Sequence, residues 1–118
     1  MLNKMILEIK IISALQLPYQ PNKEIIKDIS DPFVVINIYG VNDDLCEKKT
    51  KSIQDNGFNP IWNEDFKFLV NCPELAFVKF TVFDEDVGKD DFLGEYAIRF
   101  SNIRQGNIKT PKIFSSFF

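Results

Sequence analysis

The sequence predicts an all-β protein, an antiparallel β-sandwich that forms a single domain over residues 1–118. Short runs of alternating apolar and polar residues recur along the chain, and clusters of Pro, Gly, Asn and Asp separate them. No convincing helix lies between these runs, which favours antiparallel pairing because parallel strands need long crossover connections. Phe is abundant, at 12 of 118 residues, and suits a packed β-rich core.

The first predicted strand covers residues 6–12, where Leu7, Ile9 and Ile11 share one face. Residues 19–30 carry charges of both signs and are predicted to form a long loop. Further strands are expected over residues 33–39, 48–53, 62–70, 77–83, 92–100 and 108–114.

Two of these strands differ sharply in character. Residues 48–53 are basic and polar and form the weaker strand. Residues 62–70 carry Trp62, Phe66 and Phe68 at alternate or nearly alternate positions, and we expect these three rings in the core.

Composition excludes several classes of protein. The net charge of −3 argues against a general nucleic-acid binder, and no apolar run is long enough to span a membrane. The N-terminal ten residues are interrupted by charges, unlike a signal peptide. Cys46 and Cys72 lack a metal-ligand spacing and are expected as reduced thiols in the cytosol. The chain has no His, which removes the common nucleophile–base pairs, so a non-catalytic module is expected.

Five aspartates lie where strand-like runs meet loops: Asp31, Asp55, Asp84, Asp86 and Asp91. A stack of strands would gather such loops at one end, and clustered carboxylates repel each other unless a cation joins them. Ca²⁺ is the natural candidate, because it takes six to eight oxygen ligands in irregular geometry. The alternative is that these residues only form turns, as Asp often does. An EF-hand loop is rejected, because Lys89 stands where that motif needs Gly.

Several sequence motifs carry a resemblance to a known family. They are LEIKIISALQLP at 7–18, SDP at 30–32, NIYGV at 37–41, NGFNPIWNEDFKF at 56–68, PELAFVKF at 73–80 and DDFLG at 90–94. The chain resembles C2 domains over about residues 6–110, and is most similar to the C2 domain of phosphoinositide-specific phospholipase C. The Asn-Pro-x-Trp-Asn-Glu-x-Phe-x-Phe element is the most specific of these motifs.

The resemblance implies an antiparallel sandwich with a Ca²⁺ site built by three loops at one end. Its ligands would be Asp31, Asp55, Asp84, Asp86 and Asp91, with Asp90 an alternative to Asp91, and the backbone carbonyl near Ile29. The bound ion would bridge the protein to an anionic membrane of phosphatidylserine or phosphoinositides. The implied place of action is the cytoplasm, at membrane surfaces when calcium rises.

Two further features bear on lipid binding. Lys48, Lys49 and Lys51 form a basic segment, which is either a headgroup site, as in some C2 domains, or a solvated sheet edge guarded by Lys. Ile25, Ile26 and Val87 are candidates for insertion into the membrane interface.

The resemblance also implies an absent element. The family continues beyond the region matching residues 106–114 with one more strand, expected between the first and third strands of this chain. The resulting groove would accept a protein partner or an exchanged strand. A calcium-independent scaffold is therefore the alternative function. The catalytic barrel of a phospholipase C does not lie within these residues.

Overall fold

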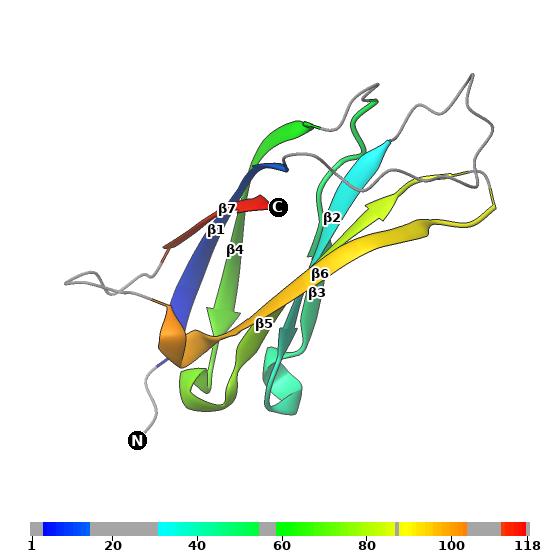
Figure 1. Cartoon of the computed structure of the whole chain (residues 1–118). Helices are drawn as coiled ribbons and strands as arrows, with labels where there is room; N and C mark the ends of the chain where they lie inside the picture. The colour runs from blue at the N-terminus through cyan, green and yellow to red at the C-terminus, as the bar shows by residue number, and fades with distance from the viewer. Residues whose placement is uncertain (1–3, 15–30, 55–58, 87, 104–111, 118) are drawn as a thin grey trace.

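The computed structural model describes residues 4–14, 31–54, 59–86, 88–103 and 112–117, the last of these as backbone only (Figure 1). The strands are β1 (Met5–Ala14), β2 (Pro32–Tyr39), β3 (Cys46–Lys49), β4 (Ile61–Val70), β5 (Phe77–Asp84), β6 (Asp91–Arg99) and β7 (Lys112–Phe117). The described residues also include three 3-10 turns, η2 (Asn42–Asp44), η3 (Pro73–Leu75) and η4 (Phe100–Asn102). No described helix has the length and apolar character of a membrane span.

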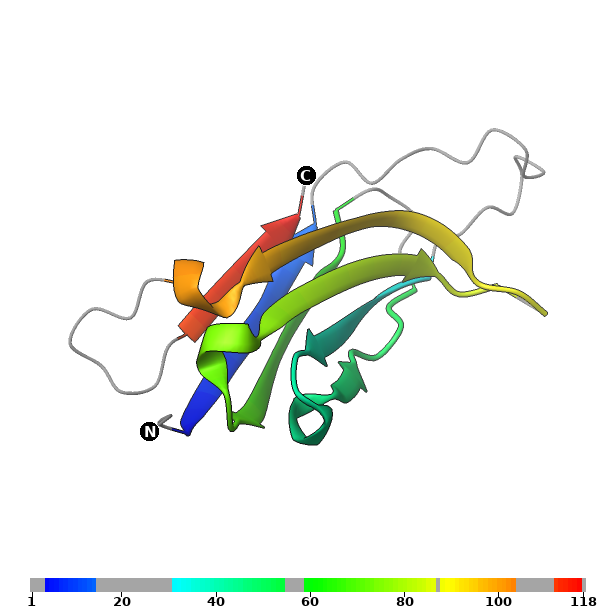
Figure 2. The same ribbon diagram turned by 90° about the horizontal axis from the view of Figure 1, so that it is seen from below.

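Two sheets pack face to face, as the sequence predicts (Figures 1 and 2). The first sheet has the strand order β4-β1-β7 and the second has the order β3-β2-β5-β6. Every pair is antiparallel except β1 with β7, which run parallel. The direction of β7 follows from where β6 ends. The end of β6 and η4 lie near the start of β1 (Figure 2), so a strand that begins at this end of the molecule and pairs with β1 runs parallel to it.

The core lies between the sheets and follows the alternation in the sequence. Leu7, Ile9 and Ile11 of β1 are 0%, 1% and 0% exposed, and Phe80 of β5 is 1% exposed. Burying such side chains contributes about 1.5–3 kcal/mol each. Trp62 is buried as well, and its indole N–H donates to the Pro32 carbonyl at 3.1 Å, which fixes the start of β2 against β4.

The expected core aromatics of β4 are confirmed with one difference of degree. Trp62 and Phe68 are buried, whereas Phe66 is partly buried and packs against the core cluster.

The third strand is shorter and earlier than the sequence predicts. It ends at Lys49 because Thr50 leaves the ladder: its hydroxyl accepts the Val34 N–H at 2.9 Å, in the place of a backbone carbonyl. The Thr50 N–H still donates to the Val34 carbonyl, also at 2.9 Å. The last strand is Lys112–Phe117 rather than 108–114, and residues 104–111 lie outside the described ranges.

The expected place of an absent strand was wrong. β1 has β4 on one side and β7 on the other, and β3 belongs to the other sheet. Lys48 of β3 donates to the Lys67 carbonyl of β4 at 2.6 Å, so these two edges face each other. If the two sheets are matched from the edge where β3 faces β4, the three described strands of the first sheet lie opposite β3, β2 and β5. β6 then has no opposing strand in the described part of the first sheet.

The exposure of Tyr96 reflects the missing strand opposite β6 in the described part of the first sheet. Tyr96 pairs in register with Phe80 and therefore points to the same face of the sheet. Phe80 is 1% exposed, whereas Tyr96 is 55% exposed. Within the described residues, the sandwich is thus open at Tyr96 in the middle of β6, whereas Leu93 of the same strand is buried in the core.

Candidate functional site: an acidic end beside a lysine cavity

Three of the predicted aspartates are brought together at one end of the second sheet. Asp84 ends β5, and in the strand register it pairs with Pro32, the neighbour of Asp31, and with Asp91. The Asp31 N–H donates to Asp84 Oδ1 at 2.8 Å, and the Glu85 N–H donates to the Asp31 carbonyl at 2.9 Å. Residues separated by 53 positions in the sequence are therefore in direct contact.

These carboxylates differ in exposure. Asp84 is 1% exposed, and Oδ1 of Asp31 is also buried. Asp91 is half-buried and Asp86, in the connection between β5 and β6, is exposed. Burying a carboxylate is costly unless donors or a cation compensate its charge, so this end of the sheet favours positive charge.

The fit of this end to Ca²⁺ is partial within the described residues. Its donors are carboxylate oxygens, which hard cations prefer. The described ranges contain no group of three or more His, Cys, Asp or Glu side chains placed to hold a metal ion. Two of the six predicted ligands, Asp55 and Ile29, lie outside the described residues, as do Ile25, Ile26 and Val87.

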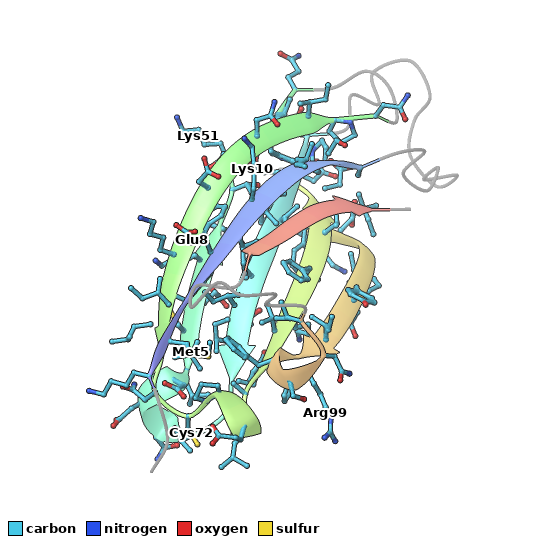
Figure 3. All side chains as sticks on the ribbon, turned by 90° about the vertical axis from the view of Figure 1, so that its left-hand side faces the viewer. Met5, Glu8, Lys10, Lys51, Cys72 and Arg99 are labelled. Carbon is cyan, nitrogen blue, oxygen red and sulfur yellow. The ribbon has the colours of Figure 1, made fainter. Side chains whose placement is uncertain are left out.

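The basic segment runs beside this acidic end. Lys48 and Lys49 point to opposite faces, as strand alternation predicts: the Lys48 ammonium lies 4.8 Å from the Phe68 ring centroid, and that of Lys49 lies 5.7 Å from Phe33. Lys51 follows the strand and is exposed. In Figure 3 it lies toward the end of the molecule opposite to Cys72. The Lys51 N–H donates to Glu64 Oε2 at 2.9 Å.

A cavity of about 460 Å³ joins the acidic and basic features. Lys49, Lys51, Ser52, Glu85 and Asp90 line it together with Phe33. The Ser52 hydroxyl donates to Glu85 Oε1 at 2.5 Å, which ties the segment after β3 to the loop after β5. The sequence does not reveal this mixture, because the lysines and carboxylates come from segments about 35 residues apart that meet only in the folded sheet.

A row of aromatic rings also crosses the outer face of the second sheet. The ring centroids of Phe33 and Phe83 are 5.6 Å apart, and those of Phe83 and Phe92 are 6.3 Å apart. Sequence reasoning missed this row. The signal was present as three Phe residues at strand ends, each within two residues of an Asp, but the register that aligns them was needed to see it.

Comparisons with known proteins agree with this architecture. The C2 domain family matches residues 5–113. The chain is 40% identical over 107 residues to mouse inactive phospholipase C-like protein 1, and 41% identical over 100 residues to human 1-phosphatidylinositol 4,5-bisphosphate phosphodiesterase eta-1. These matches cover 91% and 83% of the chain but only 10% and 6% of the relatives, so the chain spans a tenth or less of their length.

Solved structures give the same result. A C2 domain of plant extended synaptotagmin 1 is 30% identical with a TM-score of 0.64, over 84% of this chain and 69% of that one. A calcium-bound structure of extended synaptotagmin 2 that holds two C2 domains is 30% identical with a TM-score of 0.69, over 84% of this chain and 35% of that one. Because the family match extends over nearly all of the described strands, the chain belongs to the C2 domain family.

Proposed function

We propose that this chain is a non-catalytic, calcium-dependent module that binds anionic phospholipid membranes from the cytoplasm. The observation that carries the proposal is the meeting of Asp31, Asp84 and Asp91 at one end of adjacent strands, with Asp84 almost fully buried. A calcium-bound relative with 30% identity supports the choice of ion.

Each part of the acidic end has a role in this proposal. Asp31, Asp84 and Asp91 would hold the ion from the sheet, and Asp86 would hold it from the loop between β5 and β6. Asp55 and the Ile29 carbonyl would complete the ligand set. Bound Ca²⁺ would supply positive charge and open coordination positions for lipid phosphate or carboxylate oxygens.

The basic segment would act beside the ion. Lys49 and Lys51 are exposed next to the acidic end and would attract anionic headgroups, with each Lys contributing on the order of 1 kcal/mol near a charged surface. Ile25, Ile26 and Val87 stay predicted as residues that enter the membrane interface.

Liposome co-sedimentation tests the proposal directly. The chain should sediment with phosphatidylserine liposomes far more completely in millimolar Ca²⁺ than in chelator. Asp86→Asn should weaken sedimentation without harming the fold, because Asp86 is exposed, and Asp84→Asn with Asp86→Asn should remove it.

Glu74→Gln is the matched control. It removes one exposed charge at η3, at the opposite end of the molecule, and should leave binding unchanged. Failure of the parent chain to sediment at millimolar Ca²⁺ would refute calcium-dependent membrane binding.

A calcium-independent scaffold is the second candidate. It is favoured by the lack, within the described residues, of three side chains placed around one metal position. The open face of β6 at Tyr96 offers a contact for a protein partner or an added strand. A partner captured equally well in chelator and in Ca²⁺ would support this candidate over the first.

A further inference from the structure

The cavity next to the acidic end carries charges of both signs. Lys49 and Lys51 come from the end of β3 and the residues after it, whereas Glu85 and Asp90 come from the connection between β5 and β6. At about 460 Å³ the cavity has room for one small headgroup.

Specific contacts hold each side of this cavity in place. Glu85 accepts the Ser52 hydroxyl, and its own N–H is bound to the Asp31 carbonyl. On the basic side, the Lys49 ammonium lies over the Phe33 ring, and the backbone of Lys51 is bound to Glu64. The Ser52 bond brings the two sides together, so the mixed charge is a property of the fold rather than of two loose side chains.

This charge pattern discriminates among anionic headgroups. An inositol polyphosphate carries only negative charge, so Glu85 and Asp90 repel it while Lys49 and Lys51 attract it. A headgroup with an ammonium group satisfies the carboxylates as well. One that carries a phosphate, a carboxylate and an ammonium offers two anions to the two lysines and a cation to the two carboxylates.

We propose that this cavity is a calcium-independent subsite for the phosphoserine headgroup of a membrane lipid, and that Glu85 and Asp90 determine its specificity by binding the ammonium group. The proposal relies on the proposed function for the membrane that presents the lipid. It adds a site that shares only Asp90, the alternative to Asp91, with the predicted Ca²⁺ ligands, and it adds a choice between the two lipid classes considered above.

Two soluble probes isolate the ammonium group. O-Phospho-L-serine and 3-phosphoglycerate share a phosphate and a carboxylate on the same three-carbon frame and differ in an ammonium group against a hydroxyl. Titration of the chain in chelator is followed by the amide NMR shifts of Thr50, Lys51 and Ser52. These three residues line this cavity and not the neighbouring pocket that shares Lys49 and Asp90 with it. We expect phosphoserine to bind about fivefold more tightly, as two exposed ion pairs allow.

Variants assign the preference to residues. Glu85→Gln with Asp90→Asn should bring the affinity ratio close to one and strengthen binding of inositol 1,4,5-trisphosphate. Asp43→Asn, a neutralised exposed aspartate in η2, is the control and should keep the ratio. Lys49→Ala with Lys51→Ala should weaken both probes.

Vesicles connect this result with the membrane. Phosphatidylserine and phosphatidylglycerol vesicles carry the same net charge, and only the first has the ammonium group. In Ca²⁺, the single variant Glu85→Gln, which keeps every predicted Ca²⁺ ligand and Asp90, should lose part of its preference for phosphatidylserine vesicles.

The outcomes separate the two proposals. Equal affinity of the parent chain for the two soluble probes, no shift at residues 50–52, or a preference that survives in the carboxylate variant would each overturn the subsite. Loss of calcium-dependent sedimentation with the soluble preference intact would refute the proposed function and leave the subsite standing.

Discussion

Asp44 shows how one buried carboxylate joins the two sheets. It lies in η2, is 2% exposed, and accepts three hydrogen bonds: from the Asn71 N–H at 2.7 Å, the Asn71 side-chain amide at 2.9 Å and the Cys72 N–H at 2.9 Å. Burial would raise the pKa of Asp44, but the bonds from Asn71 and Cys72 outweigh it and hold this pKa below its ordinary value. The carboxylate therefore clamps the second sheet to the end of β4.

Removing this clamp should destabilise the fold. Asp44→Ala leaves the donors of Asn71 and Cys72 without their acceptor, at a cost of about 1–3 kcal/mol in the free energy of unfolding. Asp43→Ala, the exposed neighbour, should change it little. Urea unfolding followed by fluorescence of Trp62 measures both, and equal effects of the two substitutions would contradict the clamp.

The same residue gives a pH dependence with a defined sign. Because the folded-state pKa of Asp44 is lowered, its stabilising contribution is fully present above the unfolded-state pKa of about 3.9 and is lost as pH falls through the folded-state pKa. The difference in unfolding free energy between the parent chain and Asp44→Ala should therefore be constant near neutral pH and shrink below about pH 4. A difference that grows on acidification would contradict this assignment.

At the level of elements, β5 and β6 contain a natural comparison. Phe80 and Tyr96 are register partners on one face, yet only Phe80 is covered by the first sheet. Phe80→Ala should cost about 3–5 kcal/mol of unfolding free energy, as for other buried Phe residues. Tyr96→Ala should cost well under half as much, since little of its ring leaves water. Similar losses for both substitutions would show that β6 is covered on its inner face in solution.

The basic segment at the end of β3 gives a second prediction at the level of elements. Lys49→Ala with Lys51→Ala should weaken binding to phosphoinositide-containing liposomes by roughly tenfold, and the loss should shrink as salt rises, because screening already removes the same attraction in the parent chain. Co-sedimentation across a salt series measures this. Lys10→Ala with Lys67→Ala removes the same charge from the outer side of the first sheet and is the control. If the parent chain and the Lys49→Ala, Lys51→Ala variant bind the liposomes with equal affinity at low salt, these lysines only form a solvated edge of the sheet and do not bind headgroups.

The positions of the elements were largely predictable and their pairing was less so. The sequence located β1, β2, β4, β5 and β6 to within a few residues. Alternation marked β1, β4 and β5, because each of these strands has one buried face. β3 was misplaced since the Thr50 hydroxyl replaces a ladder carbonyl, a long-range contact with Val34 that no local pattern records. The parallel partnership of β1 and β7 was missed for the same reason: register between distant strands depends on tertiary packing.

For the whole molecule, calcium should act as a stabilising ligand if the proposed site is correct. A ligand that binds only the folded state at a hundredfold excess over its Kd adds about 2.7 kcal/mol to the free energy of unfolding. Thermal unfolding in Ca²⁺ should therefore occur at a higher temperature than in chelator, and Asp86→Asn should reduce the shift. An equal shift with Mg²⁺, which demands a tighter octahedral geometry, would speak against a calcium site.

The candidate site was predictable in part at this scale. The sequence placed Asp31, Asp84 and Asp91 at strand ends, and the structure brings these ends together. The sequence could not reveal that Glu85 and Asp90 share a cavity with Lys49 and Lys51, because that depends on which strand ends meet in the folded sheet. The sequence also did not identify Asp44 as a structural residue. It resembles any acidic turn residue until its hydrogen-bond donors, Asn71 and Cys72, are known.

The central place of β1 in its sheet has a consequence for how the protein is made. Met5 pairs with Val70, and Ile9 pairs with Ile113, so one neighbour of β1 is synthesised more than fifty residues later and the other more than a hundred residues later. At about 5–20 residues per second, the ribosome exposes Leu7, Ile9 and Ile11 for several seconds before their sheet can close. The second sheet, whose strands all lie between residues 32 and 99, can form first. β1 is therefore the strand whose apolar face most needs protection by a chaperone until β4 and β7 have been synthesised.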